Sequence, residues 1–353
     1  MPKKTPSPAP EKSRAPAAPS AGIDTARLAA ELLAALRGDK RSRPGFSRYL
    51  GYASNIAQRW ETGLAAPSAA TFFSICSRLR LDVPGALRAF LRRDAPWLRG
   101  ATSDTLPAAL LRELRGRARL GAVAERTPYH RSSVSRWLDG SRQPSLPELL
   151  CLIDALSGRT LDFVSSFVDP ARLPSVARRW EELVLARELA YAHPLSHAVL
   201  RALELDAYRA GGHRDAGFIP RALGMAPGEV ERALALLEQS GQVKRSRRGY
   251  EVHPRVVDTG ADPERARGVK LGWAELAVQR LRGGAPGQCG YNLFAISRAD
   301  LRRLHEIQLA FVREMQTLIA GSKGNECVGL YCSQLIDLGV ADQNVFGAKA
   351  RLE

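Results

Sequence analysis

Residues 45–79 read GFSRYLGYASNIAQRWETGLAAPSAATFFSICSRL, and residues 122–156 read AVAERTPYHRSSVSRWLDGSRQPSLPELLCLIDAL. Laid over each other without a gap, the two stretches align Trp60 with Trp137, an offset of 77 residues. The other aligned pairs include Arg59 with Arg136, Gly63 with Gly140, and Pro67-Ser68 with Pro144-Ser145. This shared register of Trp, Gly, Pro-Ser and an apolar stripe at helical spacing indicates an internal duplication.

Each stretch is predicted to form a short helix, a tight turn, a middle helix, a second turn and a longer helix. In the first stretch, Gly51 marks the tight turn, and the middle helix begins at Ser54-Asn55 and ends at Gly63. In the second stretch, the middle helix spans about residues 130–140, and the longer helix occupies residues 144–156. Trp60 and Trp137 lie on the same faces as the apolar stripes, so they are predicted to be core residues.

The middle helices end in Trp60-Glu61-Thr62-Gly63 and Trp137-Leu138-Asp139-Gly140. In this feature the chain resembles the XRE-type (Cro and phage-repressor) helix-turn-helix family, whose middle helix ends in a W-E-x-G or L-E-x-G pattern. That resemblance implies double-stranded DNA as the partner. At the tight turn the second stretch departs from the pattern, because Thr127-Pro128 replaces Leu-Gly. Proline fixes φ, and we expect this to shift the docking angle of the following helix.

The order of modules also resembles a bacterial regulator family with N-terminal helix-turn-helix domains and a conserved C-terminal domain of unknown biochemical role. The stretches that carry this resemblance are RWETG (59–63), SRWLDG (135–140), HAVLRALELDAY (197–208), YNLFAISRADLRRLHE (291–306) and CSQLIDL (332–338). The resemblance implies transcriptional control and indicates no ligand.

With 353 residues the chain is long enough for two or three domains. The predicted fold class is mainly α: tandem helix-turn-helix bundles, a winged-helix-like module and a mostly helical C-terminal domain with one or two short strands. The expected divisions are a disordered tail at 1–22, a first helix-turn-helix domain at 23–99, a second at 104–168, a connecting helix plus winged-helix-like module at 175–254, and a C-terminal regulatory or dimerisation domain at 269–340. The first helix of each helix-turn-helix domain is predicted at 25–37 and 106–115, where leucines recur at helical spacing.

Beyond residue 175 the predictions rest on shorter patterns. Helices are expected at 198–208, 218–223 and 227–239, followed by two β runs around the basic turn 244–248, an order that resembles a winged helix. Residues 254–268 are predicted to be a linker, 272–281 a helix and 291–296 a strand. Ser297 is predicted to cap a helix that reaches residue 319, and residues 327–336 fit a strand or a helix equally well.

The formal net charge of +16 favours a polyanionic partner, and nucleic acid is the usual one. A basic composition that follows from a GC-rich genome is the alternative explanation, because Ala, Arg, Gly and Pro abound. Within the second unit, arginines are dense: Arg112, Arg115, Arg117, Arg119, Arg126, Arg131, Arg136 and Arg142. Their density favours contact with phosphates in that unit.

A helix-turn-helix reads DNA with the first turns of its second helix, in the major groove. The candidate base-reading positions are Ser54, Asn55, Gln58 and Arg59 in the first unit and Arg131, Ser132, Ser135 and Arg136 in the second. Arg43 and Arg119 are candidate phosphate contacts at helix N-termini. In the winged-helix-like module, Lys244, Arg245, Arg247 and Arg248 are candidate phosphate contacts, whereas the glutamates of its third helix would repel DNA. The alternative interpretation of all these side chains is an ordinary solvated surface.

The motifs of NTPases, zinc peptidases and serine hydrolases do not occur, so neither catalysis nor a cofactor is predicted. A metal set from His305, Cys327 and Cys332 is a poor fit, since a fourth partner is missing. The five cysteines lack a CxxC pair and the sequence contains no membrane-spanning run, so a reduced, cytoplasmic and nucleoid-associated protein is expected. The leading function is sequence-specific transcriptional regulation, with a possible homodimer through residues 269–338 and an unknown small-molecule effector. The alternative is a protein-interaction adaptor, such as an anti-repressor or sigma-factor partner, that keeps the fold without reading DNA.

Overall fold

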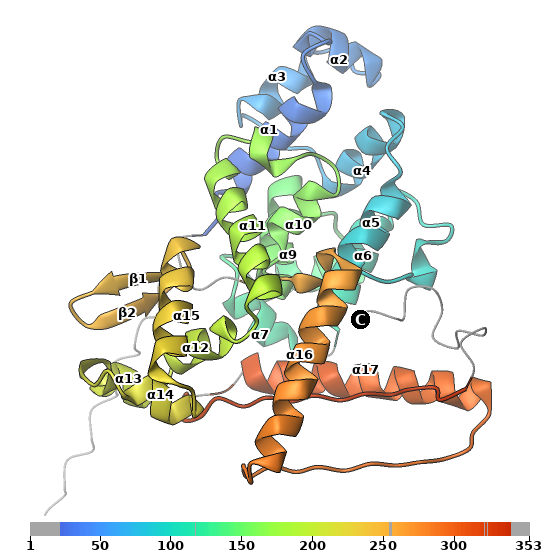
Figure 1. Ribbon diagram of the computed structural model, residues 1–353. Helices are drawn as coiled ribbons and strands as arrows, with labels where there is room; N and C mark the ends of the chain where they lie inside the picture. Colours follow the sequence, from blue (N-terminus) through green and yellow to red (C-terminus); the bar gives the residue numbers. More distant parts are fainter. Residues whose placement is uncertain (1–21, 117, 254–255, 321, 323, 340–353) are drawn as a thin grey trace, which may run out of the picture.

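The computed structural model describes residues 22–116, 118–253, 256–320, 322 and 324–339 (Figure 1). Within these residues the chain forms seventeen α-helices and one two-stranded antiparallel sheet, which confirms the predicted mainly α fold class. Of the helices in this part of the chain, none combines the length and the apolar character that crossing a bilayer requires. The tail predicted to be disordered falls, apart from residue 22, outside the described residues.

Two sets of helices follow each other in the first half of the chain. The first repeat comprises α1 (Thr25–Arg37), α2 (Arg43–Tyr49), α3 (Ile56–Glu61), α4 (Ala69–Arg78), α5 (Val83–Leu91) and the 3-10 turn η1 (Pro96–Leu98). The second repeat comprises α6 (Leu106–Arg115), α7 (Leu120–Glu125), α8 (Arg131–Asp139), α9 (Leu146–Ser157), α10 (Thr160–Ser165) and η2 (Pro170–Arg172). Helices α4 and α9 begin 77 residues apart, and so do α5 and α10. The helix order therefore repeats at the offset that the sequence predicts.

Local contacts repeat at the same offset. The rings of Tyr52 and Trp60 meet edge to face at 5.6 Å between centroids, and those of Tyr129 and Trp137 do so at 5.0 Å. Both tryptophans are buried, as predicted. Gly63 and Gly140 both have positive φ, +76° and +85°, at the ends of the middle helices, where a side chain would strain the backbone. Serines at equivalent positions, Ser68 and Ser145, cap α4 and α9.

The two repeats meet at an approximate two-fold axis between Ser68 and Ser145. These serines form an isolated antiparallel bridge. The backbone N–H of Ala69 donates to the carbonyl of Pro144 at 2.8 Å, and the N–H of Leu146 donates to that of Pro67 at 2.9 Å. Each bond is the other's image under the 77-residue shift, so the contact is self-complementary in the manner of a symmetric dimer interface.

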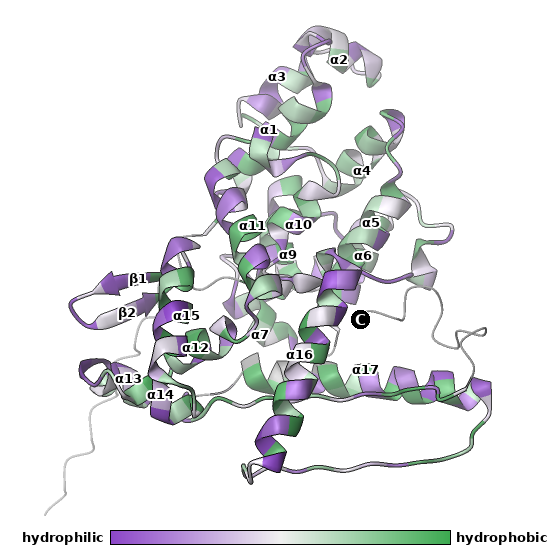
Figure 2. Ribbon diagram, in the orientation of Figure 1, coloured by the Kyte–Doolittle hydropathy of each residue, from purple (hydrophilic) through white to green (hydrophobic). Residues whose placement is uncertain are grey.

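One hydrophobic core serves both repeats. Helix α1 of the first repeat packs against α9 of the second, and α6 packs against α4. Phenylalanines from both sides interlock: Phe72 lies 5.2 Å from Phe167, and Phe90 lies 5.5 Å from Phe163. Figure 2 shows hydrophobic residues along α9 and α10, in the interior of this body. The buried cluster runs from Leu28 through both repeats without interruption, so neither repeat has a core of its own.

A polar contact in the first repeat has an apolar counterpart in the second. The carboxylate of Glu61, only 2% exposed, accepts from Arg37 Nε at 2.7 Å and from Arg43 Nε at 2.8 Å. The positions equivalent to Arg37, Arg43 and Glu61 are Leu114, Leu120 and Leu138. All three leucines belong to or pack against the hydrophobic core. The ion triad thus ties the first three helices of the first repeat together, whereas the equivalent leucines of the second repeat (the leucine triad) pack into the shared core.

The second half of the chain begins with α11 (Ala177–Ala192), which packs against η2. A small helical cluster follows: α12 (Ser196–Ala202), α13 (Asp206–Ala210), the turn η3 (Gly212–Arg214), α14 (Phe218–Leu223) and α15 (Pro227–Gln239). The strands β1 (Val243–Ser246) and β2 (Gly249–Val252) then form a hairpin in which Val243 pairs with Val252. This part has a separate core around Leu200, Leu237 and Val243. The single helix predicted at 198–208 is wrong, because the chain turns between Ala202 and Asp206, where the Asp206 N–H donates to the Asn325 carbonyl.

The C-terminal segment contains the turn η4 (Thr259–Ala261) and two long helices, α16 (Pro263–Arg282) and α17 (Arg298–Ala320). The prediction of a linker over 254–268 is wrong for its second half, because Asp262 accepts from the N–H groups of Glu264 and Arg265 and so starts α16 early. Ser297 caps α17 as predicted, with its Oγ accepting from the Asp300 N–H.

Two extended stretches flank α17 (Figure 1). The strand predicted at 291–296 is wrong, because no strand among the described residues pairs with it, and Tyr291 is 96% exposed. Residues 327–336 form neither a strand nor a helix and run antiparallel to α17. Gln308 donates to the Ser333 hydroxyl there, and Phe311 meets Tyr331. These contacts hold the stretch along the helix without a backbone ladder.

Candidate nucleic-acid interface

Helices α7 and α8 of the second repeat form two helices joined by a tight turn. His130 caps α8: its Nδ1 accepts from the Ser132 N–H at 3.3 Å and lies 2.8 Å from the Ser132 hydroxyl. Arg131 and Ser132 in the first turn are exposed. The N–H groups of Ser132 and Ser133 are thus bonded to His130, and the N-terminus of α8 presents the Arg131 guanidinium and the Ser132 hydroxyl, groups that suit anionic oxygens and base edges.

The two faces of α8 have different roles. Val134, Trp137 and Leu138 are buried in the core, which fixes the rotation of the helix. Arg136 is exposed on another face, with its Nε donating to the Ser132 carbonyl at 3.3 Å, and Ser135 is half-buried. The structure thus places the four predicted positions on the side of α8 that leaves the core.

Further basic side chains surround this helix. Arg112, Arg119, Arg126 and Arg142 are exposed, Arg115 is half-buried, and Arg117 lies outside the described residues. The acidic residues nearest to α8 in sequence are Glu125 and Asp139. Hydrogen bonds from Ser141 lower the pKa of Asp139, so this carboxylate stays charged, but it lies at the C-terminal end of α8, away from the arginine-bearing first turn. Positive charge dominates the N-terminal part of this surface.

The tight turns of the two repeats differ for a steric reason. Gly51 in the first repeat has φ of +87°, and the equivalent residue of the second repeat is Pro128, whose ring cannot adopt that angle. The second turn closes instead through Thr127, whose hydroxyl and N–H both donate to the Ala124 carbonyl. Helix α8 then begins two residues earlier than α3 does in the shared register, and its first turn carries Arg131.

In the first repeat, two of the predicted base-reading residues, Asn55 and Gln58, are hydrogen-bonded to each other. Asn55 caps α3, with Oδ1 accepting from the Gln58 N–H at 3.3 Å and Nδ2 donating to Gln58 Oε1 at 2.9 Å. Ser54, Gln58 and Arg59 are exposed, and Asn55 is half-buried. In this state Asn55 Oδ1, Asn55 Nδ2 and Gln58 Oε1 all have partners, so base reading through these atoms requires a change of partner. Arg43 is at the N-terminus of α2 as predicted, although its Nε is engaged by Glu61.

The β hairpin carries the third set of predicted residues. Lys244 and Arg245 lie in β1, Arg247 and Arg248 lie in the turn, and all four are exposed. The neighbouring helix α15 exposes Glu229, Glu231 and Glu238. The hairpin thus exposes positive charge and the preceding helix α15 exposes negative charge, so only the hairpin suits contact with a phosphate backbone.

An ion cluster that sequence patterns did not predict joins the second repeat to the rest of the chain. Asp162 of α10 pairs with Arg187 of α11 at 2.5 Å, and Asp258 pairs with Arg159 at 2.5 Å. Arg92, which follows α5, lies 3.4 Å from Asp258. Burial by itself raises the pKa of Asp258, but the charges of Arg159, Arg92 and Arg187, together with the hydrogen bond from the Gly260 N–H, outweigh it, and the pKa is lowered. The five residues come from four separate stretches, so no local spacing could have revealed the cluster.

Within the described residues, no group of three His, Cys, Asp or Glu side chains has the arrangement of a metal site. Cys76 is fully buried and Cys151 half-buried, as expected for small core residues, and burial raises the pKa of both thiols. Burial therefore disfavours a reactive thiolate at both of these positions.

Two family comparisons match parts of the chain. Residues 108–158, from α6 to the end of α9, match a family described as a helix-turn-helix domain. Residues 177–333, from α11 to the stretch beside α17, match a family described as a domain of unknown function (DUF4423). No curated protein and no solved structure was found to match the chain. The helix-turn-helix match coincides with the repeat that carries the arginine-rich first turn of α8, and it indicates DNA binding.

Proposed function

We propose that this chain is a sequence-specific transcriptional regulator that binds double-stranded DNA through two XRE-like helix-turn-helix units. The observation that carries the proposal is the first turn of α8, where Arg131 and Ser132 are exposed within the residues that match a helix-turn-helix domain. Arginine there can bond the O6 and N7 atoms of guanine, and a serine hydroxyl can bond several base edges. We infer a binding role, not a catalytic one.

The first repeat supports the proposal of two helix-turn-helix units. It shares with the second repeat the helix order, the Tyr–Trp pair, the glycine that ends the middle helix and the serine cap of the next helix. It also has the Glu61 carboxylate clamped between Arg37 and Arg43, at the glutamate of the W-E-x-G pattern. We therefore assign α2 and α3 the same role as α7 and α8.

The approximate two-fold axis between Ser68 and Ser145 predicts the form of the operator. Two reading helices related by such an axis meet DNA in opposite directions, as the helices of a symmetric dimer do. Their side chains differ, with Ser54, Asn55 and Gln58 in one and Arg131 and Ser132 in the other. We expect two inverted half-sites of different sequence, with guanine favoured in the half-site that α8 reads.

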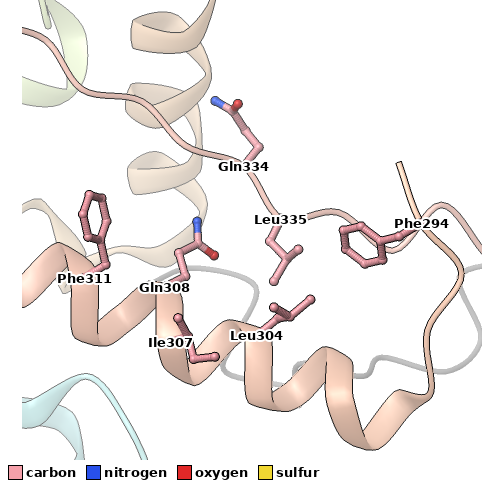
Figure 3. Close-up of a pocket in the computed structure, with 7 residues that line it drawn as sticks. All are labelled: Phe294, Leu304, Ile307, Gln308, Phe311, Gln334 and Leu335. Atoms are coloured by element: carbon pink, nitrogen blue, oxygen red, sulfur yellow. The ribbon is translucent and has the colours of Figure 1, made fainter. Parts of the chain in front are cut away.

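Helix α17 supports a homodimer within residues 269–338. Its 23 residues are about 35 Å long, and Ile307, Phe311 and Leu318 on one side are 57%, 48% and 75% exposed. A shallow recess of about 310 Å³ lies beside them, and Figure 3 shows Leu304, Leu335 and Phe294 gathered along it. We assign this apolar face to a second copy of the chain, because a two-fold contact lets the same stripe cover itself.

The dimer is tested by sedimentation of the full chain. Ile307→Glu with Phe311→Glu should shift the mass from two chains to one, because four carboxylates would be buried in the interface. Arg302→Glu, an exposed change on the opposite side of α17, is the matched control and should leave the dimer intact. A wild-type chain that sediments as a monomer at every concentration would refute the assignment.

The winged-helix-like part is proposed to make backbone contacts only. The exposed bases of the hairpin would approach phosphates, and the exposed glutamates of α15 would keep that helix away from a groove. Because DNA is the proposed partner, we also propose that the protein is cytoplasmic and nucleoid-associated.

Selection of bound duplexes from a random pool tests the proposal. The wild-type chain should enrich one motif, and Arg131→Ala with Arg136→Ala should weaken binding to it by roughly 100-fold or more, at about 1–3 kcal/mol for each specific contact. Arg209→Ala with Arg214→Ala removes the same charge from two exposed positions outside both repeats and should change affinity far less. Enrichment of no motif, together with a co-purifying protein partner, would favour the adaptor alternative.

A further inference from the structure

A cavity of about 610 Å³ lies between the second repeat and the DUF4423-matching part of the chain. Its wall includes Gly158 and Leu161 on one side, and Leu183, Leu200 and Val256 on the other. The two sides are in close contact: a Cβ placed on Gly158 would come within 2.6 Å of Val256. The volume lies within the range of pockets that hold small organic ligands.

The charged lining of this cavity is mainly basic. Four arginines line it, Arg126, Arg159, Arg179 and Arg201, against two carboxylates, Asp154 and Glu204. Glu204 pairs with Arg201 at 2.7 Å, and Asp154 accepts from the Thr160 hydroxyl at 3.0 Å. The formal balance of these groups is two positive charges, beside an apolar wall. Guanidinium groups bind carboxylate and phosphate oxygens in bidentate fashion.

We propose that this cavity is an effector site for a small organic anion, one that carries a phosphate or carboxylate group on an apolar body, and that its occupation weakens DNA binding. The claim that the anion weakens DNA binding rests on the proposed function. The claim that the anion binds in this cavity does not depend on DNA binding.

The coupling has a physical route at each end of the cavity. Arg126 follows α7 directly and belongs to the exposed basic surface of the helix-turn-helix unit. An anion that holds Arg126 removes a positive charge from that surface and ties α7 to α11 and α12. At the other end, Arg159 is shared with the ion cluster through Asp258 at 2.5 Å. An anion there competes with Asp258, whose other close partner, Arg92, follows α5 of the first repeat.

Calorimetric titration of the full chain without DNA, at constant ionic strength, tests the site. The probes are phenyl phosphate and benzoate, with benzamide as the uncharged analogue. At least one anion should bind tenfold or more tightly than benzamide, and the better of the two identifies the phosphate or the carboxylate class. Arg126→Gln with Arg179→Gln should weaken that binding at least tenfold; both positions are exposed, so the fold should survive. Arg178→Gln, one residue along α11 and 92% exposed, is the matched control and should bind as the wild type does.

The second measurement adds the selected duplex. The anion that binds should lower the affinity of the wild type for DNA by about fivefold or more, a usual size for coupling between sites, and should not do so in the Arg126→Gln, Arg179→Gln variant. Equal binding of anions and benzamide, or anion binding that survives in the double variant, overturns the site even if DNA binding holds. Anion binding in a chain that ignores all duplexes would leave the site standing and refute the proposed function instead.

Discussion

Exchange of the ion triad for the leucine triad is the sharpest test of the duplication. Glu61→Leu alone would leave Arg37 and Arg43 facing an apolar side chain at a position that is 2% exposed. Removal of one partner from a buried ion pair costs about 3–5 kcal/mol. The two arginine side chains are 18% and 46% exposed, so water offsets part of that loss, and we expect a cost of about 2–3 kcal/mol.

The triple variant Arg37→Leu, Arg43→Leu, Glu61→Leu should recover most of this loss. It copies the side chains that the second repeat has at the equivalent positions, Leu114, Leu120 and Leu138. Replacement of a complete buried ion set by packed apolar residues is often neutral, so we expect the triple variant to lie within about 1 kcal/mol of the wild type.

Thermal unfolding of the full chain, followed by circular dichroism, provides the comparison. For a body of this size a loss of 2–3 kcal/mol corresponds to a fall in Tm of about 5–10 °C. The single variant should show that fall and the triple variant should not. If the triple variant is less stable than Glu61→Leu alone, the surroundings of residues 37, 43 and 61 differ from those of their counterparts in the second repeat. That result would refute the structural equivalence of the repeats.

The remaining predictions concern a turn and the ion cluster. Gly51→Ala should destabilise the chain by more than about 1 kcal/mol, because φ is +87° there, whereas Gly121→Ala inside α7, with open space around the added methyl group, should be neutral or stabilising in the same urea titration. Asp258 has a lowered pKa in the folded chain, so its stabilising effect is complete above the ordinary value of 3.8 and is lost as the pH falls through the folded value. The Tm of the wild type should therefore fall more steeply below about pH 4 than that of Asp258→Asn, and parallel curves would show that Asp258 contributes nothing.

The sequence predicted the helices of the first half well, for identifiable reasons. Leucines at helical spacing located α1 and α6, and the aligned pairs Pro67-Ser68 and Pro144-Ser145 directly precede α4 and α9. The repeated register then carried each assignment from one repeat to the other. Patterns of this kind are local, and local patterns are what a sequence displays directly.

Local patterns could not predict the contacts between stretches that are distant in the sequence. The shared core depends on Phe72, Phe163 and Phe167 meeting across the repeats, and nothing in the spacing of these residues specifies that they meet. The strand predicted at 291–296 failed because an apolar run becomes a strand only where another edge pairs with it. Asp162 and Asp258 belong to no motif in the sequence, and their cluster forms only when the fold brings four separate stretches together.

The candidate site was predicted in part. The sequence placed Arg131 and Arg136 on the middle helix of the second unit, and the structure exposes both. It did not predict that Asn55 and Gln58 would bond each other, or that Glu61 would engage Arg43, because side-chain partners depend on rotamers and on the packing of α1 against α3.

The central claim is tested most directly by the salt dependence of DNA binding. Affinity of the full chain for the selected duplex and for a scrambled one would be measured by fluorescence anisotropy between 50 and 200 mM salt. Tighter binding to the selected duplex at every salt concentration, with affinity falling steeply as phosphate contacts exchange for counterions, is the predicted result. Equal affinity for both duplexes would contradict sequence-specific reading, and no binding to either at low salt would contradict DNA binding altogether.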